Sequence, residues 1–149
     1  MSNLELVFPE IFLSLSIMLL LIIGVFKKNS SNLIQNISLI VLLVTAVITF
    51  NETLDIEETS LFNNSVIIDY LSSFMKIITL LAAFLVLVIS SNYLKTFKIF
   101  KIEYPILILS SVLGMMVMIS SNDLIVFYMG LELQSLALYV LATFNRDQL

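Results

Sequence analysis

The feature that most constrains this chain is a series of five long apolar runs separated by short polar segments. A helix needs about 20 residues to cross the roughly 30 Å hydrocarbon core of a bilayer, and each run approaches or exceeds that length. The runs cover residues 9–26, 33–50, 69–94, 104–121 and 123–144. Because 60% of the residues are hydrophobic and only 12% are charged, the sequence predicts one all-α integral membrane domain, residues 1–149, with five transmembrane helices.

The residue types that are missing exclude several functions. The sequence contains no Cys and no His, so iron–sulfur clusters, haem, zinc and disulfides lack their usual ligands. It also lacks a glycine-rich phosphate loop, a nucleophile triad and any metal-ligand spacing. The net charge of −4 comes mainly from one acidic segment. We therefore expect no catalytic residue, metal or cofactor on this chain, and no nucleic-acid partner.

The basic residues predict how the helices are oriented. Lys and Arg are enriched in short cytoplasmic loops, and here they follow only the first, third and fifth runs, as Lys27, Lys28, Lys95, Lys98, Lys101 and Arg146. This alternation predicts an outer N-terminus and an inner (cytoplasmic or matrix) C-terminus. The segment 51–68 is then an outer, solvated loop whose acidic residues are Glu52, Asp55, Glu57 and Glu58. The first run has no basic leader and no small-x-small cleavage site, so we expect it to remain in the mature chain.

Glu132 is an isolated carboxylate near the middle of the fifth run. Placing an acidic side chain at that depth costs about 2.5–3.5 kcal/mol on insertion scales, so such residues usually have a function. Spacings of three and four residues put it on a polar helical stripe composed of Tyr128, Glu132, Ser135, Tyr139 and Thr143. We interpret Glu132 as a candidate proton-carrying group.

Lys76 is the second charge inside a predicted span. Counting about 1.5 Å per residue from the outer ends of their helices, Lys76 and Glu132 lie at similar depths, about 10 Å and 13 Å. The two side chains are therefore candidates for an ion pair, in which the ammonium would tune the proton affinity of the carboxylate. Two other interpretations stay open: a pair that only locks two helices together, or a lysine that reaches toward the outer surface.

Small residues predict a close helix contact. Ser110 and Gly114 form a small-x-x-x-small pattern in the fourth run, and Gly130 lies in the fifth. Such residues let helix backbones approach one another in membranes. We expect them to serve packing.

Three strings carry a resemblance to a known family: Leu6-Val-Phe-Pro-Glu10-Ile11, Asp69-Tyr-Leu-Ser-Ser-Phe-Met-Lys76, and Tyr128-Met-Gly-Leu-Glu132-Leu-Gln-Ser-Leu-Ala-Leu-Tyr-Val-Leu141. With them the whole chain resembles subunit N of the proton-pumping NADH:quinone oxidoreductase, respiratory complex I. The mitochondrial counterpart is subunit 2. The third string is the specific one, because its glutamate resembles the one shared by the antiporter-like subunits of the membrane arm.

The resemblance implies a membrane subunit that conducts protons and carries no redox centre. NADH, FMN, iron–sulfur clusters and quinone would be handled by other subunits, and the other membrane-arm subunits would be its partners. In the family's antiporter-like fold, Glu132 would be the helix-five carboxylate, acting with lysines of later helices. Lys76 would be a secondary element of the same proton-translocation network.

The family subunit is longer than this chain. It has about fourteen helices built around two inverted five-helix repeats, the first of which starts at helix four, so the sequence includes only two helices of that repeat. A split gene whose second product supplies the C-terminal helices, a degraded remnant and an incomplete record of a longer chain all stay open. We favour the split gene, because the spans and the helix-five string are intact.

Other functions and two locations also stay open. The chain could be a stand-alone membrane scaffold or assembly protein, or a fragment of a cation/proton antiporter. The bacterial plasma membrane is favoured over the mitochondrial inner membrane.

Overall fold

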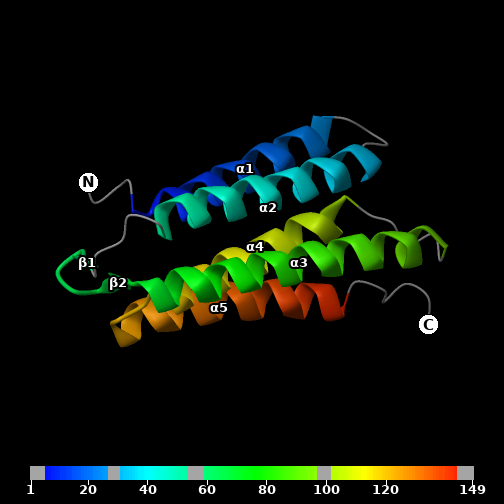
Figure 1. Ribbon diagram of the computed structural model, residues 1–149. Helices are drawn as coiled ribbons and strands as arrows, with labels where there is room; N and C mark the ends of the chain where they lie inside the picture. Colours follow the sequence, from blue (N-terminus) through cyan, green and yellow to red (C-terminus); the bar gives the residue numbers. More distant parts are fainter. Residues whose placement is uncertain (1–5, 27–30, 54–58, 97–101, 144–149) are drawn as a thin grey trace.

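The computed structural model describes residues 6–26, 31–53, 59–96 and 102–143. Within these ranges the chain forms five α-helices and one antiparallel hairpin (Figure 1). The elements are α1 (Phe8–Phe26), α2 (Ser31–Thr53), β1 (Thr59–Leu61), β2 (Val66–Ile68), α3 (Tyr70–Thr96), α4 (Glu103–Ile119) and α5 (Leu124–Ala142). Each apolar run of the sequence coincides with one helix within a few residues.

Helix α4 is shorter than the sequence predicts. In the described part of the chain α1, α2, α3 and α5 are long and apolar enough to cross a membrane, whereas α4 has 17 residues, which is about 26 Å of helix. It ends at Ile119 because the backbone that follows pairs with the hairpin. Ser120 O accepts a hydrogen bond from Ile67 N, and Asn122 N donates one to Ser65 O, both at 2.9 Å.

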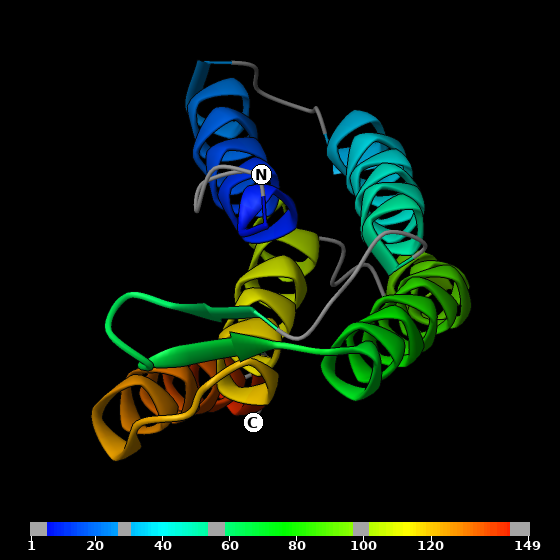
Figure 2. The ribbon, with the colours of Figure 1, turned by 60° about the vertical axis from the view of Figure 1, so that its left-hand side comes forward.

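Helix α4 occupies the centre of the bundle and contacts the other four helices. Figure 2 shows it between α1 and α2 on one side and α5 on the other. The largest buried cluster is built from α1 to α4, with Leu13, Leu42, Leu87 and Met116 among its fully buried side chains. Helix α5 buries only Gly130 and Ala137. It therefore lies at the edge of the described bundle.

The outward surface of the helices is apolar. Large aliphatic and aromatic side chains are exposed along α1, α3 and α5, for example Leu19, Val25, Ile89 and Leu136. A surface of this kind is unfavourable in water and suited to lipid.

Polar side chains of α2 point inward instead. Gln35, Ser38, Thr45 and Thr49 are all buried. The Gln35 amide donates to the carbonyl oxygen of Leu87 in α3 at 2.8 Å, while the Thr45 hydroxyl donates to Val41 O at 2.7 Å. Since unpaired polar groups are costly in a membrane interior, the Thr45 bond within α2 satisfies its buried hydroxyl, and the Gln35 bond ties this face of α2 to α3.

The hairpin was not predicted, because segment 51–68 reads as a solvated loop. Its two strands pair between Thr59–Leu61 and Val66–Ile68, and the turn has positive φ at Phe62, Asn63 and Asn64 (52°, 55° and 70°). Asn tolerates this region better than other non-glycine residues. The Asn122 side chain donates to Asn64 O at 2.7 Å, which ties the hairpin to the α4–α5 connection. We call this end of the bundle the hairpin end.

The close approach of α4 and α5 confirms the packing role expected for their glycines. A Cβ atom on Gly114 would lie 2.7 Å from Gln134 N and 2.8 Å from Gly130 O. A Cβ atom on Gly130 would lie 2.9 Å from both Gly114 O and Met118 N. Only glycine at these positions lets the two backbones lie this close.

Most of the charges that predict the orientation lie outside the described residues. These are Lys27, Lys28, Lys98, Lys101, Arg146 and, in the acidic segment, Asp55, Glu57 and Glu58. The side chain of Lys95 is not described either. The orientation of the termini therefore stays a prediction.

Candidate functional site

The buried charge of α3, Lys76, is paired with Glu10 of α1. The Lys76 Nζ atom lies 2.5 Å from Glu10 Oε1, and the residues are only 2% and 8% exposed. The ion pair expected between Lys76 and Glu132 is therefore wrong. Among the described residues, Glu10 is the acidic partner of this lysine.

The order of the helices explains why Lys76 pairs with Glu10 rather than with Glu132. Helices α1 and α2 form an antiparallel pair, and α3 starts at the same end as α1, so Glu10 and Lys76 both lie near the hairpin end (Figure 1). Helix α4 contacts both α3 and α5, whereas α3 and α5 share no extensive contact. Glu132 is thus separated from Lys76 by a helix, even if the two residues lie at similar depths.

A second carboxylate, that of Glu52, lies near this ion pair. Glu52 is in the last turn of α2 and is half-buried. Its charge interacts unfavourably with Glu10 and favourably with Lys76. The hairpin ends of α1, α2 and α3 therefore bring two acidic groups and one basic group together.

Asp69 caps the start of α3 beside this cluster. Its Oδ1 atom accepts a hydrogen bond from Ser72 N at 2.8 Å, and the Ser72 hydroxyl accepts one from Asp69 N at 3.0 Å. This reciprocal arrangement satisfies backbone donors at a helix start. The hydrogen bonds from Ser72, with a smaller contribution from the Lys76 charge, hold the pKa of Asp69 below its usual value. The cap fixes where α3 begins and hence how deep Lys76 lies.

The sequence offered one signal for Glu10 as the partner. It is an acidic residue within the first turn of an otherwise apolar helix, and alternating helix directions place that turn at the same end as the start of the third helix. Depth alone favours Glu132, because Glu10 is only the second residue of its apolar run. The choice between them depended on which helices are neighbours.

Glu132 is partly buried on α5, beside the exposed tyrosines Tyr128 and Tyr139. The residues that α5 buries, Gly130 and Ala137, define the side that meets α4. Glu132 follows Gly130 by two positions, a rotation of about 200° on a helix. Its stripe neighbours Tyr128 and Tyr139 are 60% and 67% exposed, and the Glu132 carboxylate is close enough to act on the Tyr128 hydroxyl. Within the described helices the stripe is therefore covered only in part, since Glu132 and Ser135 are partly buried and the two tyrosines are exposed.

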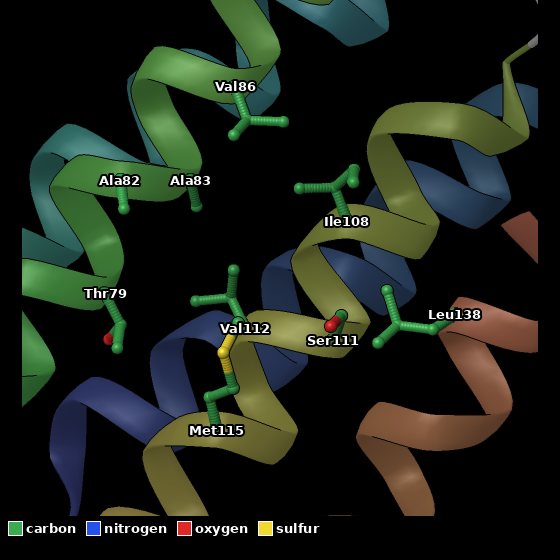
Figure 3. A pocket seen from close by; sticks show the side chains of 9 residues that line it. All are labelled: Thr79, Ala82, Ala83, Val86, Ile108, Ser111, Val112, Met115 and Leu138. Carbon is green, nitrogen blue, oxygen red and sulfur yellow. The ribbon is translucent and has the colours of Figure 1, made fainter.

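A cavity of about 230 Å³ lies between α3 and α4 and reaches α5 at Leu138 (Figure 3). Its walls are mostly aliphatic, and the only polar side chains among them are Thr79 and Ser111. Thr79 is one turn beyond Lys76, but its hydroxyl donates to the Lys76 carbonyl oxygen at 2.7 Å. The cavity suits apolar side chains or acyl chains rather than a charged ligand.

Membrane-length apolar helices, a lipid-compatible outer surface and a buried Lys–Glu pair define this chain as part of a helical integral membrane protein. No family model matches it. Comparison with curated proteins nevertheless shows that it belongs to the family of NADH-quinone oxidoreductase subunit N and corresponds to its N-terminal part. The resemblance found in the sequence is thereby confirmed.

The similarity to individual relatives extends over nearly the whole chain. The chain is 66% identical over 149 residues to NADH-quinone oxidoreductase subunit N of Pelagibacter ubique. The aligned segment covers 100% of this chain and 31% of the relative. The chain is 44% identical over 142 residues to the subunit N of Paramagnetospirillum magneticum (95% and 29%) and 44% identical over 149 residues to that of Maricaulis maris (99% and 31%). The chain spans about a third of the length of these relatives.

Proposed function

We propose that this chain is the N-terminal part of a membrane-arm subunit of complex I and takes part in proton translocation coupled to NADH oxidation and quinone reduction. The observation that carries the proposal is Glu132, a carboxylate within a membrane-length helix of a subunit N relative. An ionisable group inside a membrane is costly and commonly belongs to a proton relay. Glu132 is the proton-carrying carboxylate, and Lys76 is a second element of the proton-translocation site, acting through Glu10.

The outward face of α5 requires covering. A carboxylate facing hydrocarbon would be strongly disfavoured, yet Glu132 is only partly buried and its two tyrosines lie on a face that no described helix covers. Further helices, from the rest of the subunit or from a separate chain, therefore pack against this stripe. Other membrane-arm subunits are additional partners, and the sites for NADH, FMN, iron–sulfur clusters and quinone lie on other subunits.

The hairpin end faces outward in this proposal, and the C-terminal end of α5 faces inward. The support is the alternation of Lys and Arg along the sequence. The bacterial plasma membrane is the proposed location, because the relatives named above are bacterial.

The test replaces Glu132 with Gln in the assembled complex, which keeps the size and removes the charge. We expect NADH-driven proton pumping to fall by at least about tenfold, measured as acidification with a fluorescent probe in sealed membranes. Glu103→Gln is the control, because Glu103 is exposed at the start of α4. Unchanged pumping in Glu132→Gln would exclude the role. A fall that only matches a loss of assembled complex would make Glu132 structural.

A scaffold or assembly role is the second candidate, favoured by the Lys76–Glu10 pair that joins α1 to α3. Purification of the tagged chain in mild detergent distinguishes the proton-translocation role from the scaffold role. Co-purified complex I subunits support the first proposal, and isolation of the chain alone supports the second.

A further inference from the structure

A polar hollow lies at the hairpin end, between the start of α3 and the end of α4, and has a volume of about 270 Å³. Asp69 and Ser72 line it from the start of α3, while Ser120 and Ser121 line it from the segment that joins α4 to α5. Among the described residues, its walls include none of those assigned to proton translocation. The hollow is therefore a site of its own.

The three serines of the hollow can only accept hydrogen bonds. Each hydroxyl uses its single hydrogen on a backbone carbonyl oxygen: Ser72 on that of Asp69, Ser120 on that of Met116 and Ser121 on that of Met118. A hydroxyl has one hydrogen to donate but two lone pairs that can accept. These side chains therefore favour a ligand that brings its own donors.

Asp69 gives the hollow a negative charge. Its pKa lies below the usual value, so the carboxylate is ionised at neutral pH. Oδ1 accepts a hydrogen bond from Ser72 N at 2.8 Å, but a carboxylate has room for several more. The Lys76 charge, deeper on α3, is balanced by its pairing with Glu10. A carboxylate surrounded by accepting hydroxyls favours a primary ammonium group, which has a positive charge and three N–H donors.

The groove between α3 and α4 continues from this hollow into the apolar cavity of Figure 3. Its wall passes from Met75 to Thr79 on α3 and from Ile119 to Met115 on α4, in each case one turn deeper into the membrane. The Thr79 hydroxyl already donates to a backbone carbonyl oxygen, which leaves Ser111 as the other polar side chain of the walls. A buried water needs about two to four polar partners. Hydrocarbon therefore suits this cavity better than water does.

The groove has about the length of one leaflet and is open along its side. At about 1.5 Å per residue, Asp69 lies about 21 Å from Ala83 along α3. Half of a bilayer with its headgroups measures about 20–22 Å. Met75, Ala82 and Val86 of the walls are exposed, so a chain can enter sideways. One lipid molecule, with its headgroup in the hollow and a chain in the cavity, fits both the polarity and the length.

We propose that the groove between α3 and α4 binds one phospholipid with a primary ammonium headgroup, phosphatidylethanolamine, from the leaflet at the hairpin end. The ammonium binds Asp69 and the serine hydroxyls, one acyl chain lies in the apolar cavity, and the phosphate stays outside the hollow toward water. A choline headgroup has no N–H donor and a glycerol headgroup has no positive charge, so lipids of these two kinds bind more weakly. This site goes beyond the role proposed for Glu132 and does not depend on it.

The test is photo-crosslinking in the assembled complex at rest. The probe is phosphatidylethanolamine with a diazirine in one acyl chain, and the matched probe is phosphatidylcholine with the same chain. Mass spectrometry of the digested subunit then locates the label. We expect the ethanolamine probe to label segments 79–86 and 108–115 at least about threefold more than the choline probe does, because only its headgroup donates N–H hydrogen bonds to the carboxylate.

Two variants test the two ends of the groove. Asp69→Asn keeps a capping oxygen and removes the charge, so labelling by the ethanolamine probe should fall to the level of the choline probe. Asp123→Asn is its control, because Asp123 also caps a helix at the hairpin end but is not a wall of the hollow. Ala82→Phe fills the cavity from an exposed position and should remove labelling by both probes, whereas Leu85→Phe, exposed on α3 outside the cavity, should not.

Two results would overturn the proposal. One is a wild-type complex in which the ethanolamine probe labels neither segment, as expected if a further helix of the subunit fills the groove. The other is equal labelling by the two probes together with unchanged labelling in Asp69→Asn, which would mean that the headgroup is not recognised. Because neither readout requires proton pumping, both results leave the test of Glu132 unaffected.

Discussion

Lys76 of α3 holds Glu10 of α1 at an Nζ–Oε1 distance of 2.5 Å, inside the membrane-spanning part of the bundle. The two residues are separated in the sequence by one helix, α2, and the hairpin, and they come together because α1 and α3 start at the same end. Buried pairs of this kind contribute little net stability compared with apolar side chains, but removing one partner leaves an uncompensated charge. Replacing one of the two residues should therefore destabilise the protein more than replacing both.

A double-mutant cycle should show that Glu10 and Lys76 are coupled. Lys76→Met alone leaves the Glu10 charge buried and should destabilise the protein by about 3–5 kcal/mol, and adding Glu10→Gln should recover at least about 1 kcal/mol. Unfolding in bilayers or mixed micelles measures both effects. The same cycle on Glu132 and Lys76 is the control and should be additive within about 0.5 kcal/mol. Additivity for Glu10 and Lys76 would contradict the pair.

Enlarging either glycine of the α4–α5 contact should separate these helices. Gly114→Ala places a methyl group against the backbone of Gln134 and Gly130, which cannot move without shifting α5. We expect a loss of about 1–3 kcal/mol in unfolding free energy. Gly24→Ala is the matched control, because its new methyl group would meet the side chains of Ile102 and Ile34 instead. Equal losses of unfolding free energy in Gly114→Ala and Gly24→Ala would show that the backbone contact between α4 and α5 is no more sensitive to a methyl group than a side-chain contact.

Asp69 should stabilise α3 in a pH-dependent way. Asp69→Ala removes the cap and should cost about 1 kcal/mol, whereas Asp69→Asn keeps a capping oxygen and removes only the charge. Because the pKa of Asp69 is lowered in the folded state, its charge contributes stability above its unfolded pKa and loses it as the pH falls through the folded one. The difference between wild type and Asp69→Asn should thus shrink in acid. A difference independent of pH would contradict the cap.

The side chain of Asn122 should protect the hairpin. Asn122→Ala removes the 2.7 Å bond to Asn64 O but leaves the backbone bond from Asn122 N to Ser65 O. We expect faster hydrogen exchange at Ile67 N, which bonds to Ser120 O, by the equivalent of about 0.5–1.5 kcal/mol. Asn36→Ala, at an exposed position of α2, is the control. Unchanged exchange at Ile67 would mean that the backbone bonds alone hold the hairpin.

The hairpin and the length of α4 could not be predicted from the sequence. Strands of three residues, Thr59–Leu61 and Val66–Ile68, are too short for an alternating pattern to be read. Ser120 and Ser121 look like the continuation of an apolar run, and only their bonds to the hairpin end the helix there.

The sequence by itself determined that the chain is a helical membrane protein, where its helices run and that Glu132 and Lys76 are its two unusual charges. These three features follow from local hydrophobicity, because each residue contributes its own free energy of membrane insertion at its position in the sequence. Only the tertiary structure decided which acid faces Lys76. That choice depends on which helices are neighbours. Helix α4 packs between α3 and α5 and so separates Glu132 from Lys76, whereas Glu10 of α1 pairs with Lys76 directly.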